Sequence, residues 1–165
     1  MRLINCIVIH CTATPNGRWT TVADIDRWHM QRGFRREPVP RNAFNPALMA
    51  IGYHHVIYAN GAIATGRSHA EVGAHAIGHN ANSLGLALVG TDKFSAAQWV
   101  ALRELIQALT QPRGSRPAMY PEARIVGHRD LPNVNKLCPG FSVANWLAAG
   151  MEPPAHHLYS EETPK

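Results

Sequence analysis

Short, almost continuous apolar runs alternate along the chain with longer amphipathic stretches. The first run, Leu3 to Ile9, is rich in β-branched residues and predicts a strand that is buried on both faces and central in its sheet. Further strands are predicted over residues 51–58, 62–67, 84–89 and 124–126. Alternation in the second strand would place Tyr53, His55 and Ile57 on one face. The Asn60-Gly61 pair that follows is typical of a type I′ hairpin turn.

The amphipathic stretches predict three helices, over residues 21–32, 95–109 and 142–149. Thr20 or Thr21 can cap the first helix, and Gly33 can end it. His29 recurs with apolar residues along this helix, so we expect it to pack in the core rather than to bind a metal. Residues 34–49, which are rich in proline and arginine, predict an irregular loop.

Composition narrows the class of protein. A length of 165 residues fits one domain with a sizeable core, and no stretch is apolar for long enough to insert into a membrane. The net charge of +5 is moderate, and four arginines cluster between residues 32 and 41. This cluster fits either a solvated loop or attraction to an anionic partner such as a cell-wall polymer. Basic and aromatic residues do not alternate as they do in single-strand-binding proteins, so we expect no nucleic-acid partner.

The N-terminus and the three cysteines indicate a cytoplasmic site of synthesis. The N-terminal apolar run is too short for a signal peptide and is interrupted by Asn5. Cys6 and Cys11 lie at odd spacing on one predicted strand, so their side chains should point to opposite faces and cannot form a disulfide. We therefore expect buried thiols in a protein made in a reducing compartment.

Candidate chemistry concentrates in residues 127–141, where prolines and a glycine indicate a shaped loop containing His128 and Cys138. Imidazole and thiolate are good ligands for zinc, and a catalytic zinc needs three protein ligands beside an open position. A third ligand must therefore come from elsewhere. His10 stands at the end of the first predicted strand, where sites gather in open sheets. It is either that ligand or a core histidine bonded to the backbone.

Five motifs then follow one another along the chain: Ile9-His10-Cys11-Thr12-Ala13-Thr14, Ile51-Gly52-Tyr53-His54, Val72-Gly73-Ala74-His75-Ala76, Asn82-Ser83-Leu84-Gly85, and Gly127-His128-Arg129-Asp130 through Lys136-Leu137-Cys138-Pro139. Over roughly residues 3–147 the chain resembles the zinc N-acetylmuramoyl-L-alanine amidases of the bacteriophage T7 lysozyme and peptidoglycan-recognition-protein type. The loop at residues 34–49 and the spacer between His128 and Lys136 are longer than in the phage enzyme.

The resemblance implies an α/β fold with a mixed central β-sheet flanked by helices. It implies a catalytic domain over residues 1–150 and a C-terminal tail over residues 151–165. The residues that it assigns are His10, His128 and Cys138 as ligands of one Zn²⁺ per chain, Tyr53 and Lys136 as catalytic residues, and His75 and Asn80 as substrate-binding residues. In that assignment Tyr53 orients the attacking water or protonates the leaving amine, and Lys136 stabilises the oxyanion.

The implied activity is hydrolysis of the amide between N-acetylmuramic acid and L-alanine in peptidoglycan. We expect a monomeric phage or prophage endolysin, made without a signal peptide, that acts on the cell wall after release and does not insert into the membrane. A cytoplasmic amidase that recycles anhydro-muropeptides is one alternative, but such relatives tend to carry Asp where Cys138 stands. A non-catalytic muropeptide-binding module is the other, but such proteins typically lack the cysteine ligand.

Overall fold

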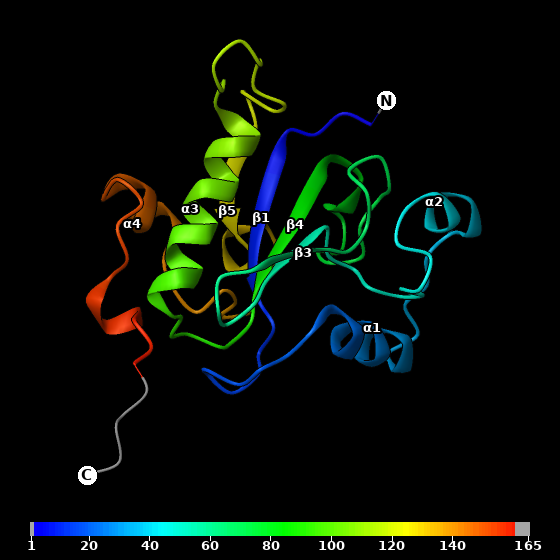
Figure 1. Ribbon diagram of the computed structural model, residues 1–165, viewed down its shortest axis with the longest axis horizontal. Coiled ribbons are helices and arrows are strands. Elements are labelled where there is room, and N and C mark those ends of the chain that lie inside the picture. The colour runs from blue at the N-terminus through cyan, green and yellow to red at the C-terminus, as the bar shows by residue number, and fades with distance from the viewer. Residues whose placement is uncertain (1, 161–165) are drawn as a thin grey trace.

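The computed structural model describes residues 2–160 and consists of one mixed sheet between two layers of helices and loops (Figure 1). The strands are β1 (Cys6–Cys11), β2 (His55–Ile57), β3 (Ile63–Thr65), β4 (Ser83–Leu88) and β5 (Arg124–Gly127). The helices are α1 (Val22–Gln31), α2 (Pro38–Ala43), α3 (Ala96–Thr110) and α4 (Val143–Ala148). The strand order is β3-β2-β4-β1-β5, with only β3 antiparallel to its neighbour. The predicted α/β fold with a mixed sheet is confirmed.

Strand β1 is central, as its continuous apolar sequence predicts. It pairs in parallel with β4 on one side and β5 on the other, and all six of its residues are buried. The strand begins at Cys6 rather than at Leu3 and runs on through His10 to Cys11. The prediction was therefore wrong about both ends of this strand. Pairing with β4 begins only at Cys6, and it continues through His10 although the His10 side chain is polar.

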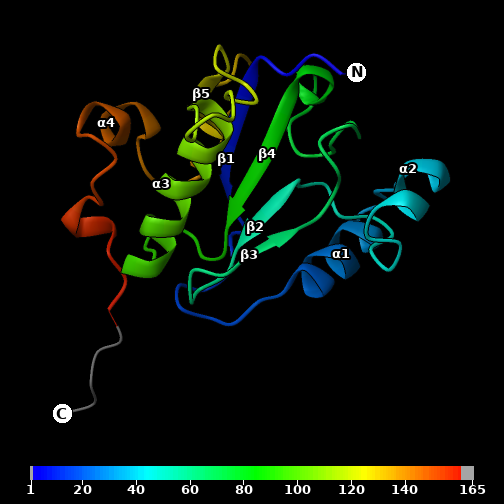
Figure 2. The same cartoon turned by 45° about the horizontal axis from the view of Figure 1, so that its top comes forward.

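Alternation along β1 and β4 gives the two faces of the sheet different roles. Figure 2 shows α3 and α4 beside one face and α1 beside the other. The largest apolar cluster joins β1 and β4 to α3 and α4, and it includes Trp99 and Trp146. On the opposite face a smaller cluster packs Ile25 of α1 against Val56 and Ala87. His10 points toward this second face, which is covered partly by loops.

The predicted strand over residues 51–58 is much shorter in the structure, where β2 begins at His55. Before that point the backbone of Gly52 bonds elsewhere: its N–H donates to His29 Nδ1 at 2.9 Å, and its carbonyl accepts from Ala74 N at 3.0 Å. Strict alternation therefore fails, and Tyr53 packs with Val56 rather than with Ile57. The expected packing role of His29 is confirmed.

The turn between β2 and β3 also differs from the prediction. Of the Asn60-Gly61 pair only Gly61 has a positive φ, at 84°, whereas a type I′ turn requires positive φ at both residues. Tyr58 accepts a hydrogen bond from Gly61 N at 2.8 Å and donates to Ala62 O at 2.9 Å. The hairpin therefore has a three-residue loop, in which a single left-handed glycine closes the turn.

Residues 34–49 are more ordered than an irregular loop. They contain α2, which begins at Pro38, a position where the missing N–H of proline costs nothing. Arg36 is only 4% exposed, and its Nη2 lies 2.8 Å from Glu71 Oε2. Its Nη1 also donates to Leu48 O at 2.9 Å. For Arg36 the solvated-loop interpretation of the arginine cluster is wrong, because this side chain ties two long loops together.

Residues 151–160 lie against α3 rather than projecting from the domain. Phe94 N donates to His157 O at 2.9 Å, and Tyr159 N donates to Phe94 O at 2.8 Å. Residues 161–165 of the predicted tail lie outside the described residues, and the domain boundary at residue 150 stays a prediction. Between residues 2 and 160, none of the helices has the length and apolar character needed to cross a bilayer.

The buried Arg36–Glu71 pair generates a first prediction. Arg36→Met leaves Glu71 facing only Arg67, whose Nη1 is 3.5 Å away, and should lower the free energy of unfolding by about 3 kcal/mol. The matched control is Arg27→Met, which breaks an exposed pair with Asp24 and should cost less than about 1 kcal/mol. Urea denaturation measures both, and equal losses would contradict a structural role for the buried pair.

His29 generates a second prediction, on pH. Burial, with the charges of Arg32 and Arg67, lowers the pKa of His29 to about 4, so the unfolded chain binds the proton more readily than the folded protein. Stability therefore falls as the pH drops below about 6.5 toward 4. His29→Asn keeps an acceptor for Gly52 N–H but does not titrate. Between pH 7 and 5 its free energy of unfolding should therefore fall by about 2 kcal/mol less than that of the parent protein. Unfolding curves on chelator-treated protein test this, and parallel pH profiles would refute it.

Candidate metal centre

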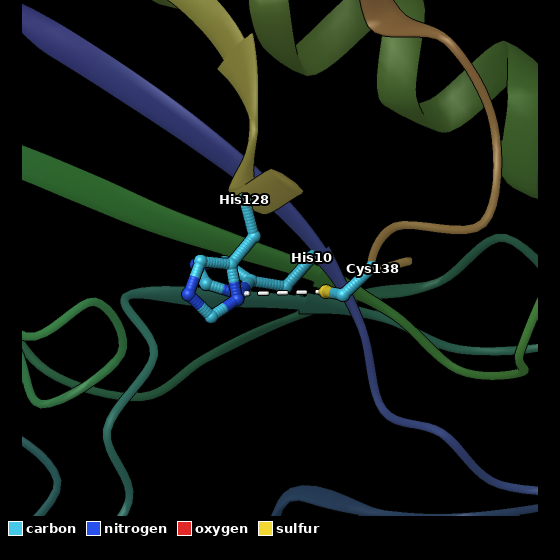
Figure 3. A group of neighbouring side chains, drawn as sticks. All are labelled: His10, His128 and Cys138. Carbon is cyan, nitrogen blue, oxygen red and sulfur yellow. Dashed lines mark hydrogen bonds between the residues drawn. The ribbon is translucent and has the colours of Figure 1, made fainter. Parts of the chain in front are cut away.

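Three side chains from distant parts of the sequence converge at one end of the central strands. His10 lies near the carboxyl end of β1, and His128 begins a short 3₁₀ turn directly after β5. Cys138 comes from the loop that follows, and Figure 3 shows all three side chains directed toward one point. Their ligand atoms all lie within 4.8 Å of one another, with His10 Nδ1 3.7 Å from Cys138 Sγ.

This donor set fits zinc. With Zn–N of about 2.0–2.1 Å and Zn–S of about 2.3 Å, tetrahedral geometry separates a nitrogen and a sulfur ligand by about 3.6 Å. The observed separation of 3.7 Å between His10 Nδ1 and Cys138 Sγ agrees with this value. Within residues 2–160, no further His, Cys, Asp or Glu belongs to the group, so three protein donors face the position of the metal.

Both imidazoles are held in the neutral form that a metal requires. Burial lowers the pKa of His10 well below its usual value, and the nearby His75 and His128 lower it further. Burial also lowers the pKa of His128, helped by the positive charge of Lys136. A metal ion therefore displaces no proton from either ring at neutral pH.

The sulfur donor, Cys138, differs from the two imidazoles in its protonation state. The neighbouring Cys11 thiol and burial raise the pKa of Cys138, so the metal-free protein keeps this thiol protonated. The backbone N–H of Cys11 nevertheless points at Cys138 Sγ from 3.2 Å, as a donor would to a thiolate. The pocket is thus shaped for a thiolate whose charge needs a cation beside it.

The two expected catalytic residues line the same cleft, which has a volume of about 950 Å³. The ring of Tyr53 lies 5.2 Å from that of His10 between centroids. Burial raises the pKa of Tyr53 above its usual range, so its hydroxyl keeps its proton. Lys136 is exposed at the mouth of the cleft, close enough for its charge to act on both His10 and His128. The structure brings both residues to the metal centre, and their catalytic roles stay predictions.

The two expected substrate-binding residues also line the cleft but are engaged with the protein. His75 Nδ1 lies 3.0 Å from His10 Nε2, on the side of that ring away from Cys138. Asn80 Oδ1 accepts hydrogen bonds from the backbone N–H groups of His75 and Ala76, both at 2.9 Å. Both residues therefore shape the loop behind the metal centre, and direct substrate contact by them stays a prediction.

Sequence reasoning missed two residues that complete the centre. Cys11, whose backbone contacts Cys138, was assigned only a buried thiol, although its place directly after His10 could have indicated the contact. Ser83, the first residue of β4, places its Oγ 3.3 Å from His75 Nε2. No local pattern in the sequence indicates that second contact, because it depends on how the loop between His75 and Ser83 folds back.

Comparison with known sequences assigns the family. A family model described as N-acetylmuramoyl-L-alanine amidase matches residues 1–141. The endolysin of Escherichia phage T7 is 31% identical over 150 residues, which cover 86% of this chain and 84% of the phage protein. The endolysin of Enterobacteria phage T3 is 32% identical over 148 residues, covering 85% of this chain and 83% of the relative.

Solved structures agree in fold. The N-acetylmuramoyl-L-alanine amidase LysC from Clostridium intestinale superimposes with a TM-score of 0.68 at 28% identity, covering 90% of this chain and 85% of LysC. Drosophila peptidoglycan recognition protein LB shares the fold alone, with a TM-score of 0.64 at 20% identity over 99% of this chain and 88% of its own. The family expected from the sequence motifs is confirmed: this chain belongs to the N-acetylmuramoyl-L-alanine amidases.

Proposed function

We propose that the protein is a zinc-dependent peptidoglycan hydrolase that cleaves the amide between N-acetylmuramic acid and L-alanine. The observation that carries this proposal is the convergence of His10, His128 and Cys138 at the base of an open cleft, with ligand atoms within 4.8 Å of one another. One Zn²⁺ per chain would be held there. Three protein donors leave a position for water, and zinc supplies a Lewis acid for hydrolysis of the amide.

The residues around the centre supply the remaining chemistry. Tyr53 keeps its phenolic proton, so it orients the attacking water or donates a proton to the leaving amine. Lys136 brings a positive charge to the mouth of the cleft, where it stabilises the oxyanion that develops on the amide carbonyl. The neutral rings of His10 and His128 stay available as metal ligands throughout.

The shape of the cleft suits a polymeric substrate. Two of its walls are loops, residues 74–80 and residues 132–136, and His29, Arg32 and Phe34 from the end of α1 and just beyond it also line the cleft. Exposed groups on both walls, including Ile77 and Lys136, offer contacts to a stem peptide that extends beyond the scissile bond.

Among enzymes with this activity, we propose a phage or prophage endolysin that acts as a monomer on the cell wall. The T7 and T3 relatives carry that name, and each matches this chain over most of its length. A recycling amidase is the weaker alternative because Cys138 occupies the third ligand position. A purely binding module is weaker still because the full donor set is present beside Tyr53 and Lys136.

Digestion of purified sacculi tests the proposed function. The zinc-loaded protein should release material with new N-terminal alanine, and a chelator should abolish this release until zinc is restored. Edman or dansyl end-group analysis measures the product. Activity confined to soluble anhydro-muropeptides would instead support the recycling enzyme. Binding to sacculi without new alanine ends would support the binding module, and either result would overturn the endolysin proposal.

Lys136 generates a separate kinetic prediction. Lys136→Ala should keep zinc at one per chain but lower kcat roughly 100- to 1000-fold, because it removes charge from the oxyanion. The matched control is Lys93→Ala, at an exposed lysine outside the cleft, which should leave kcat unchanged. Zinc content and rates of alanine release are measured on the same preparations. Full activity in Lys136→Ala would remove this residue from the mechanism.

A further inference from the structure

We propose that His75 is a positioning residue that holds the His10 imidazole in the orientation and tautomer needed to bind the metal. The inference rests on the proposed zinc function and adds a role for a residue behind the metal centre. Its starting observation is that the two nitrogens of His10 face different partners. Nδ1 faces Cys138 Sγ at 3.7 Å, and Nε2 faces His75 Nδ1 at 3.0 Å.

These contacts fix the proton on His10. A neutral imidazole binds a metal through the nitrogen without hydrogen, so Nδ1 is free for zinc only when Nε2 carries the proton. The Nε2–H then donates to His75 Nδ1. The opposite tautomer of His10 would require the proton of His75 to lie on Nδ1, and it would direct an N–H of His10 toward the metal position.

The hydrogen-bond chain continues in one direction beyond His75. His75 Nε2 lies 3.3 Å from Ser83 Oγ, and because the one hydroxyl proton of Ser83 is donated elsewhere, Nε2 carries the proton of His75 and Nδ1 is left to accept from His10. The Ser83 hydroxyl in turn donates to the carbonyl of His79 at 2.7 Å. Each of the three side chains in this series, His10, His75 and Ser83, therefore donates once and accepts once. The series of hydrogen bonds ends on the His79 carbonyl, which can only accept.

Close packing holds the His75 ring in place. A Cβ atom built on Gly85 of β4 would lie 2.5 Å from Cγ of His75, and one on Gly73 would lie 2.5 Å from its Cδ2. Only glycine leaves room for the ring at these two positions. The backbone N–H of His75 is also tied, at 2.9 Å, to Asn80 Oδ1. The acceptor for His10 is thus positioned by the fold before any metal arrives.

Removing such a hydrogen bond to a metal ligand typically costs 10- to 100-fold in metal affinity. Two substitutions separate this role from simple packing. His75→Leu fills similar space but offers no acceptor, whereas Asn in His75→Asn places its Oδ1 where Nδ1 stood. We expect His75→Leu to weaken zinc binding by about 10- to 100-fold, and His75→Asn to stay near the parent.

The experiment is a competition between each full-length variant and a chromophoric chelator, without substrate. The visible spectrum of the cobalt(II)-loaded proteins reports the ligand geometry, and it should change in His75→Leu but not in His75→Asn. Thermal unfolding of the metal-free proteins measures any structural cost separately. Ser83→Ala removes the hydroxyl that accepts from His75 and leaves the space occupied by the His75 ring unchanged. It provides a second variant should His75→Leu fail to fold. It should also weaken zinc binding.

Equal zinc affinities and unchanged cobalt spectra in all variants would overturn the inference. So would equal losses in His75→Leu and His75→Asn, because packing alone would then explain them. These outcomes are distinct from failure of the proposed function. A parent protein that binds zinc but releases no alanine from sacculi refutes the amidase mechanism and leaves the affinity comparison standing. A parent that binds no zinc refutes both.

Discussion

The parallel pairing of β1 with β5 is the constraint on which the metal centre depends. In this register Ile9 lies opposite Gly127, so the residue that follows each of them, His10 on β1 and His128 just after β5, lies at the same end of the sheet. Two imidazoles more than a hundred residues apart therefore meet without any loop having to place them. The loop that carries Cys138 is tied to the same edge by a hydrogen bond from Arg129 N to Cys138 O at 2.8 Å. A slip of β5 by one residue would turn His128 to the other face of the sheet, and the three donors would no longer converge.

The two faces of the sheet divide stability from chemistry. The face under α3 and α4 holds the large apolar core around Trp99 and Trp146. The other face is covered largely by loops, which are held by buried polar groups as well as by the smaller apolar cluster. Asp26 of α1 accepts from the backbone N–H groups of Ala50 and Ile51, both at 2.7 Å. Such contacts order long connections, and so leave room for a polar cleft beside a rigid sheet.

Local periodicity was enough to predict the central strand and the long helices, and the resemblance of the motifs to a known family predicted the three converging donors. Sequence reasoning failed where long-range contacts decide. Tyr53 faces the second apolar cluster because the backbone at Gly52 bonds to His29 and to the loop at residue 74, which no alternation pattern contains. Arg36 is buried because Glu71 meets it from another loop. The contact between His75 and Ser83 likewise depends on the folded path of the loop that joins them, which periodicity does not predict.

The most direct test of the account is X-ray absorption at the zinc edge on the purified, zinc-loaded protein, combined with metal analysis. We expect one zinc per chain with two nitrogen ligands at about 2.0–2.1 Å, one sulfur at about 2.3 Å and one further light atom. Cys11 lies beside the centre, so the specific competing possibility is that its thiolate is a fourth protein ligand. Two sulfur ligands around the zinc would mean a closed structural site. The absence of any sulfur ligand would mean that Cys138 does not bind the zinc. Either result would contradict the proposed hydrolase.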